Sequence, residues 1–315
     1  MIQMFNINNY VIDTSKFDHV LHSAEVTEFE KEFAHYVGAK YACSVNSATS
    51  AIFLIFLQKN IVVNVPSIIP PVVLNAIING GNRINFIDNI SWVGDSYVLH
   101  NFGDYKVIDS AQKVEKNQFK IEADSEDLII YSFYPTKPVG GLDGGMIVSD
   151  DYQKICYYKQ AVLNGMHYAN NNWNRKIVFP GWKMYMNSFQ ASVARQNFYK
   201  LSEKMKRLSE IRSIYNNKLG YANTSGHLYR INVKDNQHAI EHMRDRGVTC
   251  GIHYGAAHMN PVYSKSALKL DSKCPLSERM HKTTLSIPFH EKMSNLDVEK
   301  VIHDITQYNT EGEIT

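Results

Sequence analysis

The chain has 315 residues, of which 44% are hydrophobic and 20% are charged, and its formal net charge is +2. That length allows more than one domain with a sizeable core, and so small a net charge gives no reason to expect nucleic acid or an anionic membrane as a partner. The four cysteines form no CxxC pair. Neither a zinc site nor a disulfide framework is therefore indicated, and a reducing cytoplasm is the expected compartment.

Nothing in the sequence has the pattern of an export signal or of a membrane segment. Residues 1–10 lack a basic stretch followed by an apolar one, so they do not read as a signal peptide. The longest apolar run, residues 51–57, is too short to span a bilayer, which takes about 20 residues. We therefore expect no membrane association.

Helical and strand-like segments alternate through the first two thirds of the chain. Apolar residues at helical spacing predict a helix over Val26–Val37 that ends at Gly38, and Ser47 can cap a second helix that runs to Leu57. A third helix is expected over Pro71–Ile78. This alternation favours an α/β fold with a mostly parallel central sheet and helices on both faces, which binds ligands beyond the carboxyl ends of its strands. The expected strands are residues 41–45, 61–65, 83–87, 97–100, 106–108, 128–133 and 146–148.

The last third of the chain has a different pattern. A long helix is expected over Asn187–Leu219. After it come a strand (Leu228–Val233), a helix (Ala239–Arg246), a strand (Cys250–Tyr254) and a last helix (Leu296–Tyr308). We interpret the chain as a large domain of residues 1–205 and a smaller C-terminal α+β domain of residues 206–315, with the boundary inside the long helix.

The segment Asn46-Ser-Ala-Thr-Ser-Ala51 lies at a junction between a strand and a helix. Small residues there let backbone N–H groups approach an anion, and the helix dipole favours negative charge. Thr49 can add a hydroxyl donor. The alternative is a capped helix without a ligand.

Asp109 directly follows an apolar strand, so its carboxylate should lie at the carboxyl end of that strand. A buried carboxylate is costly unless it is paired. One use is to pair with the protonated pyridine nitrogen of pyridoxal phosphate (PLP), which makes the ring a better electron sink. The alternative is an aspartate that accepts hydrogen bonds from turn amides.

Lys137 follows a second buried strand and lies in a loop rich in Pro and Gly. Desolvation lowers the pKa of a lysine and makes it a nucleophile that can form a Schiff base. Ser132, five residues earlier, could bind a phosphate. The alternative is an exposed loop lysine.

The segment Gly251-Ile-His-Tyr-Gly-Ala-Ala-His-Met-Asn-Pro261 contains two histidines five residues apart. No carboxylate or cysteine cluster accompanies His253 and His258, so no metal site is indicated. Either the segment borders the active site or both histidines are structural.

Taken in order, these segments resemble the sugar aminotransferases of the DegT/DnrJ/EryC1/StrS family, from about Val26 to the end of the chain. Asp109-Ser-Ala-Gln112 matches the Asp-x-x-Gln motif of the family, and Ser132-Phe-Tyr-Pro-Thr-Lys137 matches its Ser-Phe-x-x-x-Lys motif. The other similar segments are residues 28–42, 46–51, 252–263, 275–279 and 285–290.

The resemblance implies the PLP-dependent transferase type I fold and a homodimer with active sites shared at the subunit interface. Lys137 would form the Schiff base with PLP, Asp109 would pair with the pyridine nitrogen, and Gln112 would contact the 3-oxygen side of the ring. The residues that would hold the phosphate are Ala48, Thr49 and Ser132. Those that would border the substrate are His253, Tyr254 and His258.

The activity implied is transfer of an amino group from L-glutamate or L-glutamine to a keto sugar linked to a nucleotide, in amino-sugar biosynthesis. Lys137 would also move the proton between the amino-acid carbon and the cofactor carbon. One alternative is a PLP-dependent sugar dehydratase, although such relatives have histidine in place of the lysine. Another is a non-catalytic relative that binds a ligand or a partner.

The sequence departs from the family pattern at three places. Pro70 occupies the position of the aromatic residue that stacks on the cofactor ring. Lys183 replaces an Asn that reaches the phosphate of the neighbouring subunit, and Tyr185 replaces an Arg. A lysine could still contact a phosphate as a point charge. The helix expected between His100 and Asp109 is missing, because only eight residues separate them.

Overall fold

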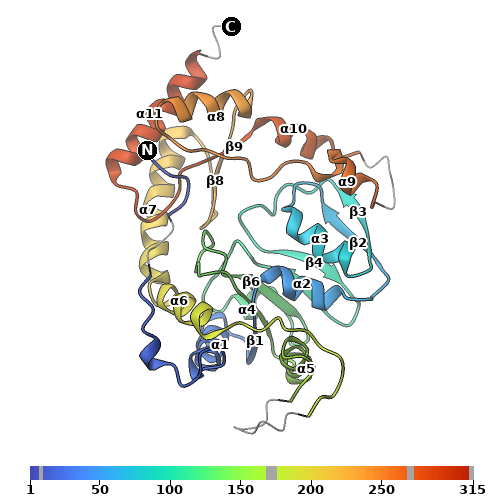
Figure 1. Cartoon of the computed structure of the whole chain (residues 1–315). Helices are drawn as coiled ribbons and strands as arrows, with labels where there is room; N and C mark the ends of the chain where they lie inside the picture. Colours follow the sequence, from blue (N-terminus) through green and yellow to red (C-terminus); the bar gives the residue numbers. More distant parts are fainter. Residues whose placement is uncertain (7–9, 168–175, 268–272, 312–315) are drawn as a thin grey trace.

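The computed structural model describes residues 1–6, 10–167, 176–267 and 273–311. Its central feature is a five-stranded sheet with the order β1-β7-β6-β5-β4 (Figure 1). A separate parallel pair, β2 with β3, lies beside β4. These strands are β1 (Tyr41–Val45), β2 (Val62–Pro66), β3 (Arg83–Ile87), β4 (Tyr97–Asn101), β5 (Lys106–Asp109), β6 (Leu128–Ser132) and β7 (Gly145–Ser149).

The sheet is mixed rather than mostly parallel. Only β5 and β6 run parallel within it, whereas β4 pairs antiparallel with β5, and β7 pairs antiparallel with both β6 and β1. The reason at β4 is the short connection to β5. Phe102 and Tyr105 close a tight turn, in which the Phe102 N–H donates to the Tyr105 carbonyl at 2.9 Å. A parallel crossover needs a dozen or more residues, so strands joined this closely form a hairpin.

Helices cover both faces of the sheet, as the sequence predicts. Alternate residues of β6 show why: Ile130 packs into a core with α2, α3 and α5, while Ile129 and Tyr131 pack into another with α1, α4 and α6. These helices are α1 (Ala24–Val37), α2 (Ala48–Phe56), α3 (Pro71–Asn79), α4 (Gln118–Glu122), α5 (Tyr152–Val162) and α6 (Ser188–Tyr199).

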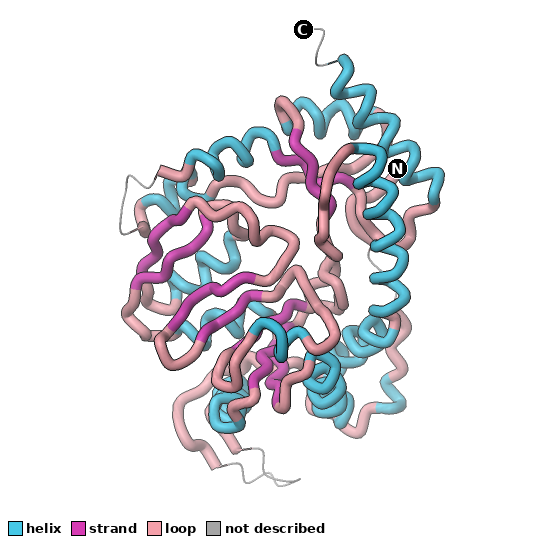
Figure 2. The backbone as a smooth tube through the Cα atoms, turned by 180° about the vertical axis from the view of Figure 1, so that it is seen from behind, coloured by secondary structure: helices cyan, strands magenta, loops and turns pink. Residues whose placement is uncertain are grey.

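The C-terminal elements form a third hydrophobic core. Helix α7 (Leu201–Leu219) runs along one side of the molecule from the sheet towards these elements (Figure 2). The predicted domain boundary after residue 205 lies inside α7 and remains a prediction. The other C-terminal elements are β8 (Tyr229–Asn232), α8 (Asn236–Asp245), α9 (Pro261–Ser264), α10 (Pro275–Thr283), β9 (Thr284–Ile287) and α11 (Asn295–Glu311), with short 3-10 turns at Thr14–Lys16 and Ala257–Met259.

Two predicted elements differ from the structure. The helix expected over Asn187–Leu219 is divided at Lys200, whose N–H bonds to the carbonyl of Asn197, three residues earlier, and tightens the turn. The strand expected at Cys250–Tyr254 is reduced to a bridge between Gly251 and Ser286. No helix within the described residues is long and apolar enough to cross a membrane.

The core under α1 supplies a stability prediction. Replacing Phe33 with Ala should lower the free energy of unfolding by about 3–5 kcal/mol, because its fully buried ring contacts the rings of Tyr131 and Phe133. As a control, Ile121→Ala should change it by less than about 0.5 kcal/mol, since Ile121 is 76% exposed. Urea unfolding followed by circular dichroism measures both, and equal effects would contradict the assignment of Phe33 to the core.

Candidate active site

Four strand ends meet at one edge of the central sheet. Asp109 ends β5 and Ser132 ends β6, and because these strands are parallel their carboxyl ends lie at the same edge. Gly145, the first residue of β7, pairs with Ser132 on one side and with Val45, the last residue of β1, on the other. The predicted site residues of three chain segments therefore converge here.

The amino end of α2 lies at the same edge. The Ser47 hydroxyl caps the helix by accepting the N–H of Ser50 at 3.1 Å, whereas the first-turn amides of Ala48 and Thr49 have no acceptor within the helix. A Cβ on Gly145 would meet the Ala48 nitrogen at 2.7 Å. Glycine thus allows β7 to approach the helix end, and free amides at a helix amino end suit an anion such as a phosphate.

Asp109 and Lys137 form the charged centre of this edge. The Asp109 carboxylate is 5% exposed and accepts the Ala111 N–H at 2.9 Å and the Tyr97 hydroxyl at 3.1 Å. Burial raises the pKa of Asp109, although the Ala111 amide, the Lys137 charge and the Tyr97 hydroxyl each lower it. Burial lowers the pKa of Lys137 to about 8, against the opposing effect of the Asp109 charge. Lys137 is thus a shielded lysine beside a carboxylate.

Gln112 is buried next to this pair and is held at both ends of its amide. Its oxygen accepts the Gly94 N–H at 2.9 Å, and its nitrogen donates to the Tyr254 hydroxyl at 3.3 Å. The Tyr254 ring lies parallel to the Trp92 ring, with centroids 6.1 Å apart. Gln112 therefore links the loop after β5 to the segment that precedes α9.

Two histidines from the C-terminal part approach Lys137. Burial, together with the Lys137 charge, lowers the pKa of His253 to about 4, and the His253 Nδ1 lies 2.9 Å from the Ser286 hydroxyl. His227 is also buried, and the same two causes hold its pKa well below the ordinary value. Phe5 stacks on His227 and meets His253 edge-on. Both imidazoles are accordingly neutral near pH 7.

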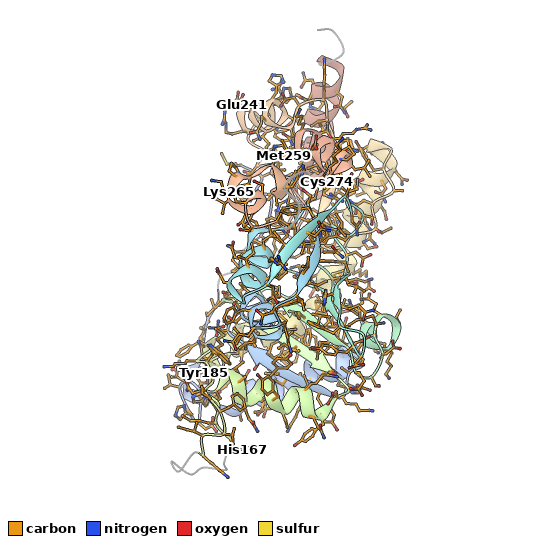
Figure 3. All side chains as sticks on the ribbon, turned by 90° about the vertical axis from the view of Figure 1, so that its right-hand side faces the viewer. His167, Tyr185, Glu241, Met259, Lys265 and Cys274 are labelled. Carbon is orange, nitrogen blue, oxygen red and sulfur yellow. The ribbon has the colours of Figure 1, made fainter. Side chains whose placement is uncertain are left out.

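One predicted residue, His258, makes its hydrogen bonds outside this cluster. The His258 Nδ1 lies 2.6 Å from the Ser67 hydroxyl and its Nε2 lies 3.4 Å from Glu278, and none of its contacts in the described part of the chain reaches Lys137. Figure 3 shows the adjacent Met259 in the upper half of the molecule. Pro70 is the residue directly before α3 and is half-buried, and its place at the cofactor ring remains a prediction.

The segment that carries Lys183 passes beside the carboxyl end of β1. Tyr185 bridges to Val45, and the Met184 carbonyl accepts the Asn46 N–H at 2.8 Å. Tyr185 lies in the lower half of Figure 3. The Lys183 side chain is exposed in the single chain, so its predicted contact with a second subunit remains a prediction.

Sequence reasoning missed several residues around the site. The connection of four residues between β4 and β5 predicts a hairpin, but a regular register would set Val98 opposite Asp109, and only the irregularity between Val98 and His100 sets Tyr97 there. Trp92, His227 and Arg230 carry no such local signal, since each reaches the site only through tertiary packing. In the described residues no group of histidine, cysteine and carboxylate side chains could hold a metal ion.

Comparisons with known proteins agree with this site. A model of the DegT/DnrJ/EryC1/StrS aminotransferase family matches residues 3–90 and 116–306. The spore coat polysaccharide biosynthesis protein SpsC of Bacillus subtilis is 27% identical, over 89% of this chain and 88% of its own. The Campylobacter jejuni UDP-4-amino-4,6-dideoxy-N-acetyl-beta-L-altrosamine transaminase is 25% identical over the same shares.

A solved structure confirms the type I fold. The aminotransferase TlmJ from Streptoalloteichus hindustanus superposes with a TM-score of 0.82 at 20% identity, and the match covers 100% of both chains. The matched stretches of the family model account for most of the present chain. The chain therefore belongs to the DegT/DnrJ/EryC1/StrS aminotransferase family of PLP-dependent sugar transaminases.

Proposed function

We propose that the chain moves an amino group from L-glutamate or L-glutamine to the keto group of a sugar linked to a nucleotide, as a step of amino-sugar biosynthesis. The observation that carries this proposal is the buried Asp109 beside Lys137, whose pKa burial has lowered. The name of the Campylobacter relative, a transaminase of a UDP-linked amino sugar, supports a nucleotide-linked acceptor.

The residues at the sheet edge fit PLP. Lys137 would hold the cofactor, Asp109 would face its pyridine nitrogen and Gln112 would face the 3-oxygen side, because Lys137 acts on the Asp109 carboxylate and Gln112 donates to Tyr254, which faces the same carboxylate. The phosphate would lie at the free amides of Ala48 and Thr49, with Ser132 at the neighbouring strand end and with Pro70 on the face of the ring. When bound, PLP supplies an electron sink for the bond that breaks at the amino-acid carbon.

Lys137 is suited to hold and return a proton at its Nζ. With a pKa of about 8, this amine exchanges protons near neutral pH, where an ordinary lysine stays protonated. The Ala111 amide and the Tyr97 hydroxyl donate to Asp109 and thereby favour its charged form. His253, which the Lys137 charge reaches, and Tyr254, which accepts a hydrogen bond from Gln112, would border the substrate.

We also propose a homodimer in which Lys183 of one chain meets the cofactor phosphate of the other. Lys183 is exposed in the single chain, and its segment runs beside Asn46, which directly precedes the cap of α2. A second subunit at this surface would bring the ammonium group to an anion, which is the partner that a buried cation needs.

The first experiment tests Lys137. The purified protein should be yellow with PLP, and borohydride should attach the cofactor to the peptide that contains Lys137, as read by mass spectrometry. Lys137→Ala should lower turnover with L-glutamate by roughly 10²–10⁴-fold, the range for losing a general acid–base group. Lys40→Ala, at an exposed lysine, is the control. Label on another lysine would overturn the assignment.

The second experiment tests Asp109. Asp109→Asn should nearly abolish the half-reaction with L-glutamate. It should also lower the pKa of Lys137 below about 8, because the carboxylate charge that raises it is gone. The pH dependence of Lys137 acylation in the cofactor-free protein measures that pKa, and the exposed Asp104→Asn serves as control. An unchanged half-reaction would show that Asp109 lacks the proposed role.

The third experiment tests Lys183. Lys183→Ala should weaken PLP binding and should remove the stabilisation that PLP gives the dimer, since a ligand that bridges two chains favours their association. Analytical ultracentrifugation with and without PLP measures the dimer, and Lys116→Ala, at another exposed lysine, is the control. If Lys183→Ala binds PLP as the unaltered protein does, the shared site is refuted.

A further inference from the structure

The two stretches matched by the family model leave out residues 91–115, and this gap contains β4, β5 and both predicted ring anchors, Asp109 and Gln112. In this chain the gap folds as a hairpin with a short turn rather than as strands joined by a helix. The contacts around Asp109 and Gln112 are therefore particular to this chain.

The register of the hairpin sets Tyr97, the first residue of β4, opposite Asp109, the last residue of β5. The Tyr97 hydroxyl donates to Oδ2 of Asp109 at 3.1 Å, and the Ala111 N–H donates to Oδ1 at 2.9 Å. One donor on each oxygen fixes the plane of the carboxylate. An oxygen with two lone pairs still has room for a further donor.

Tyr97 is itself held in place by neighbouring aromatic rings. Its ring lies 4.4 Å from that of Trp92, whose Nε1 donates to the Ile68 carbonyl at 3.0 Å. Trp92 lies parallel to Tyr254, which accepts a hydrogen bond from Gln112. The two ring anchors thus belong to one connected network that passes through Trp92.

The charge of Asp109 depends on a small set of groups. The Ala111 amide, Lys137 and Tyr97 favour its ionised form, while burial opposes it, and Tyr254 also faces it. Burial, together with the Asp109 charge, raises the pKa of Tyr97 well above its ordinary value, so the phenol keeps its proton near neutral pH. A hydrogen bond to a buried charge is among the stronger ones in proteins.

We propose that Tyr97 is a positioning residue that orients Asp109 towards the pyridine nitrogen of PLP and keeps it ionised. The inference rests on the proposed function of Asp109 and Lys137. Tyr97 acts through Asp109 and does not need to touch the substrate.

The test is Tyr97→Phe, which removes one oxygen and leaves the ring packed against Trp92. The dissociation constant of PLP, from absorbance titration of the cofactor-free protein, should rise on the order of 10-fold. The acid limb of PLP binding should move to higher pH, because Asp109 without the Tyr97 donor has a higher pKa and loses its charge sooner as the pH falls.

The matched control is Tyr105→Phe, a tyrosine in the turn of the same hairpin that stacks on Phe102 and does not contact Asp109. It should leave both the affinity and the acid limb unchanged. Thermal melting compares the folding of the two variants. If Tyr105→Phe weakened PLP binding as much as Tyr97→Phe does, the loss would come from disturbing the hairpin in general. That result would overturn the role assigned to Tyr97.

A second measurement separates positioning from packing. In an Asp109→Asn background, Tyr97→Phe should have little further effect on PLP affinity, whereas a packing role would lower affinity equally in both backgrounds. If PLP affinity and the acid limb of Tyr97→Phe match those of the unaltered protein, the inference is refuted while the proposed function stands. If the unaltered protein fails to bind PLP through Lys137, the proposed function itself is refuted.

Discussion

A carboxylate buried at the end of a strand needs hydrogen-bond donors and positive charge around it, because an unpaired buried charge is costly. Asp109 is such a carboxylate at the edge of the central sheet. Its partners come from three parts of the chain: the amide of Ala111 in the following loop, the hydroxyl of Tyr97 on the neighbouring strand, and the ammonium group of Lys137 in the loop after β6. Each partner is in reach because β4, β5 and β6 are adjacent. The adjacent strand ends thus supply the partners that one buried carboxylate needs.

Burial acts on the basic groups of the site in the opposite direction. It lowers the pKa of Lys137 to about 8 and that of His253 to about 4, and it lowers that of His227 as well. The Asp109 charge raises the pKa of Lys137 and offsets part of the lowering by burial. The Lys137 charge instead lowers the pKa values of His253 and His227 further, because it repels their protonated forms. The outcome is one titrating amine among imidazoles that stay neutral, which suits the role proposed for Lys137 in binding a carbonyl cofactor and exchanging a proton.

The shortened chain before Asp109 changes the sheet as well as the site. With four residues between β4 and β5, a parallel crossover is sterically excluded, and β4 returns antiparallel along β5. That reversal brings Tyr97 to the site edge and sets Trp92 between the hairpin and Tyr254. An aromatic network thus lies beside Asp109 and Gln112.

The sequence by itself determined where the strands end and which side chains lie at those ends. The apolar runs that stop before Asp109 and near Ser132, the loop with Lys137 and the capped helix after Ser47 are local patterns, and the structure places all four at one edge. Local patterns could not decide the register of β4 against Asp109, the division of the long helix at Lys200, or the distance of His258 from the lysine. Those features depend on which distant segments pack together, because packing decides where a strand pairs irregularly and where a helix divides. Tyr97 shows the difference most clearly. The sequence names this tyrosine, but only the folded hairpin shows that its hydroxyl donates to Asp109.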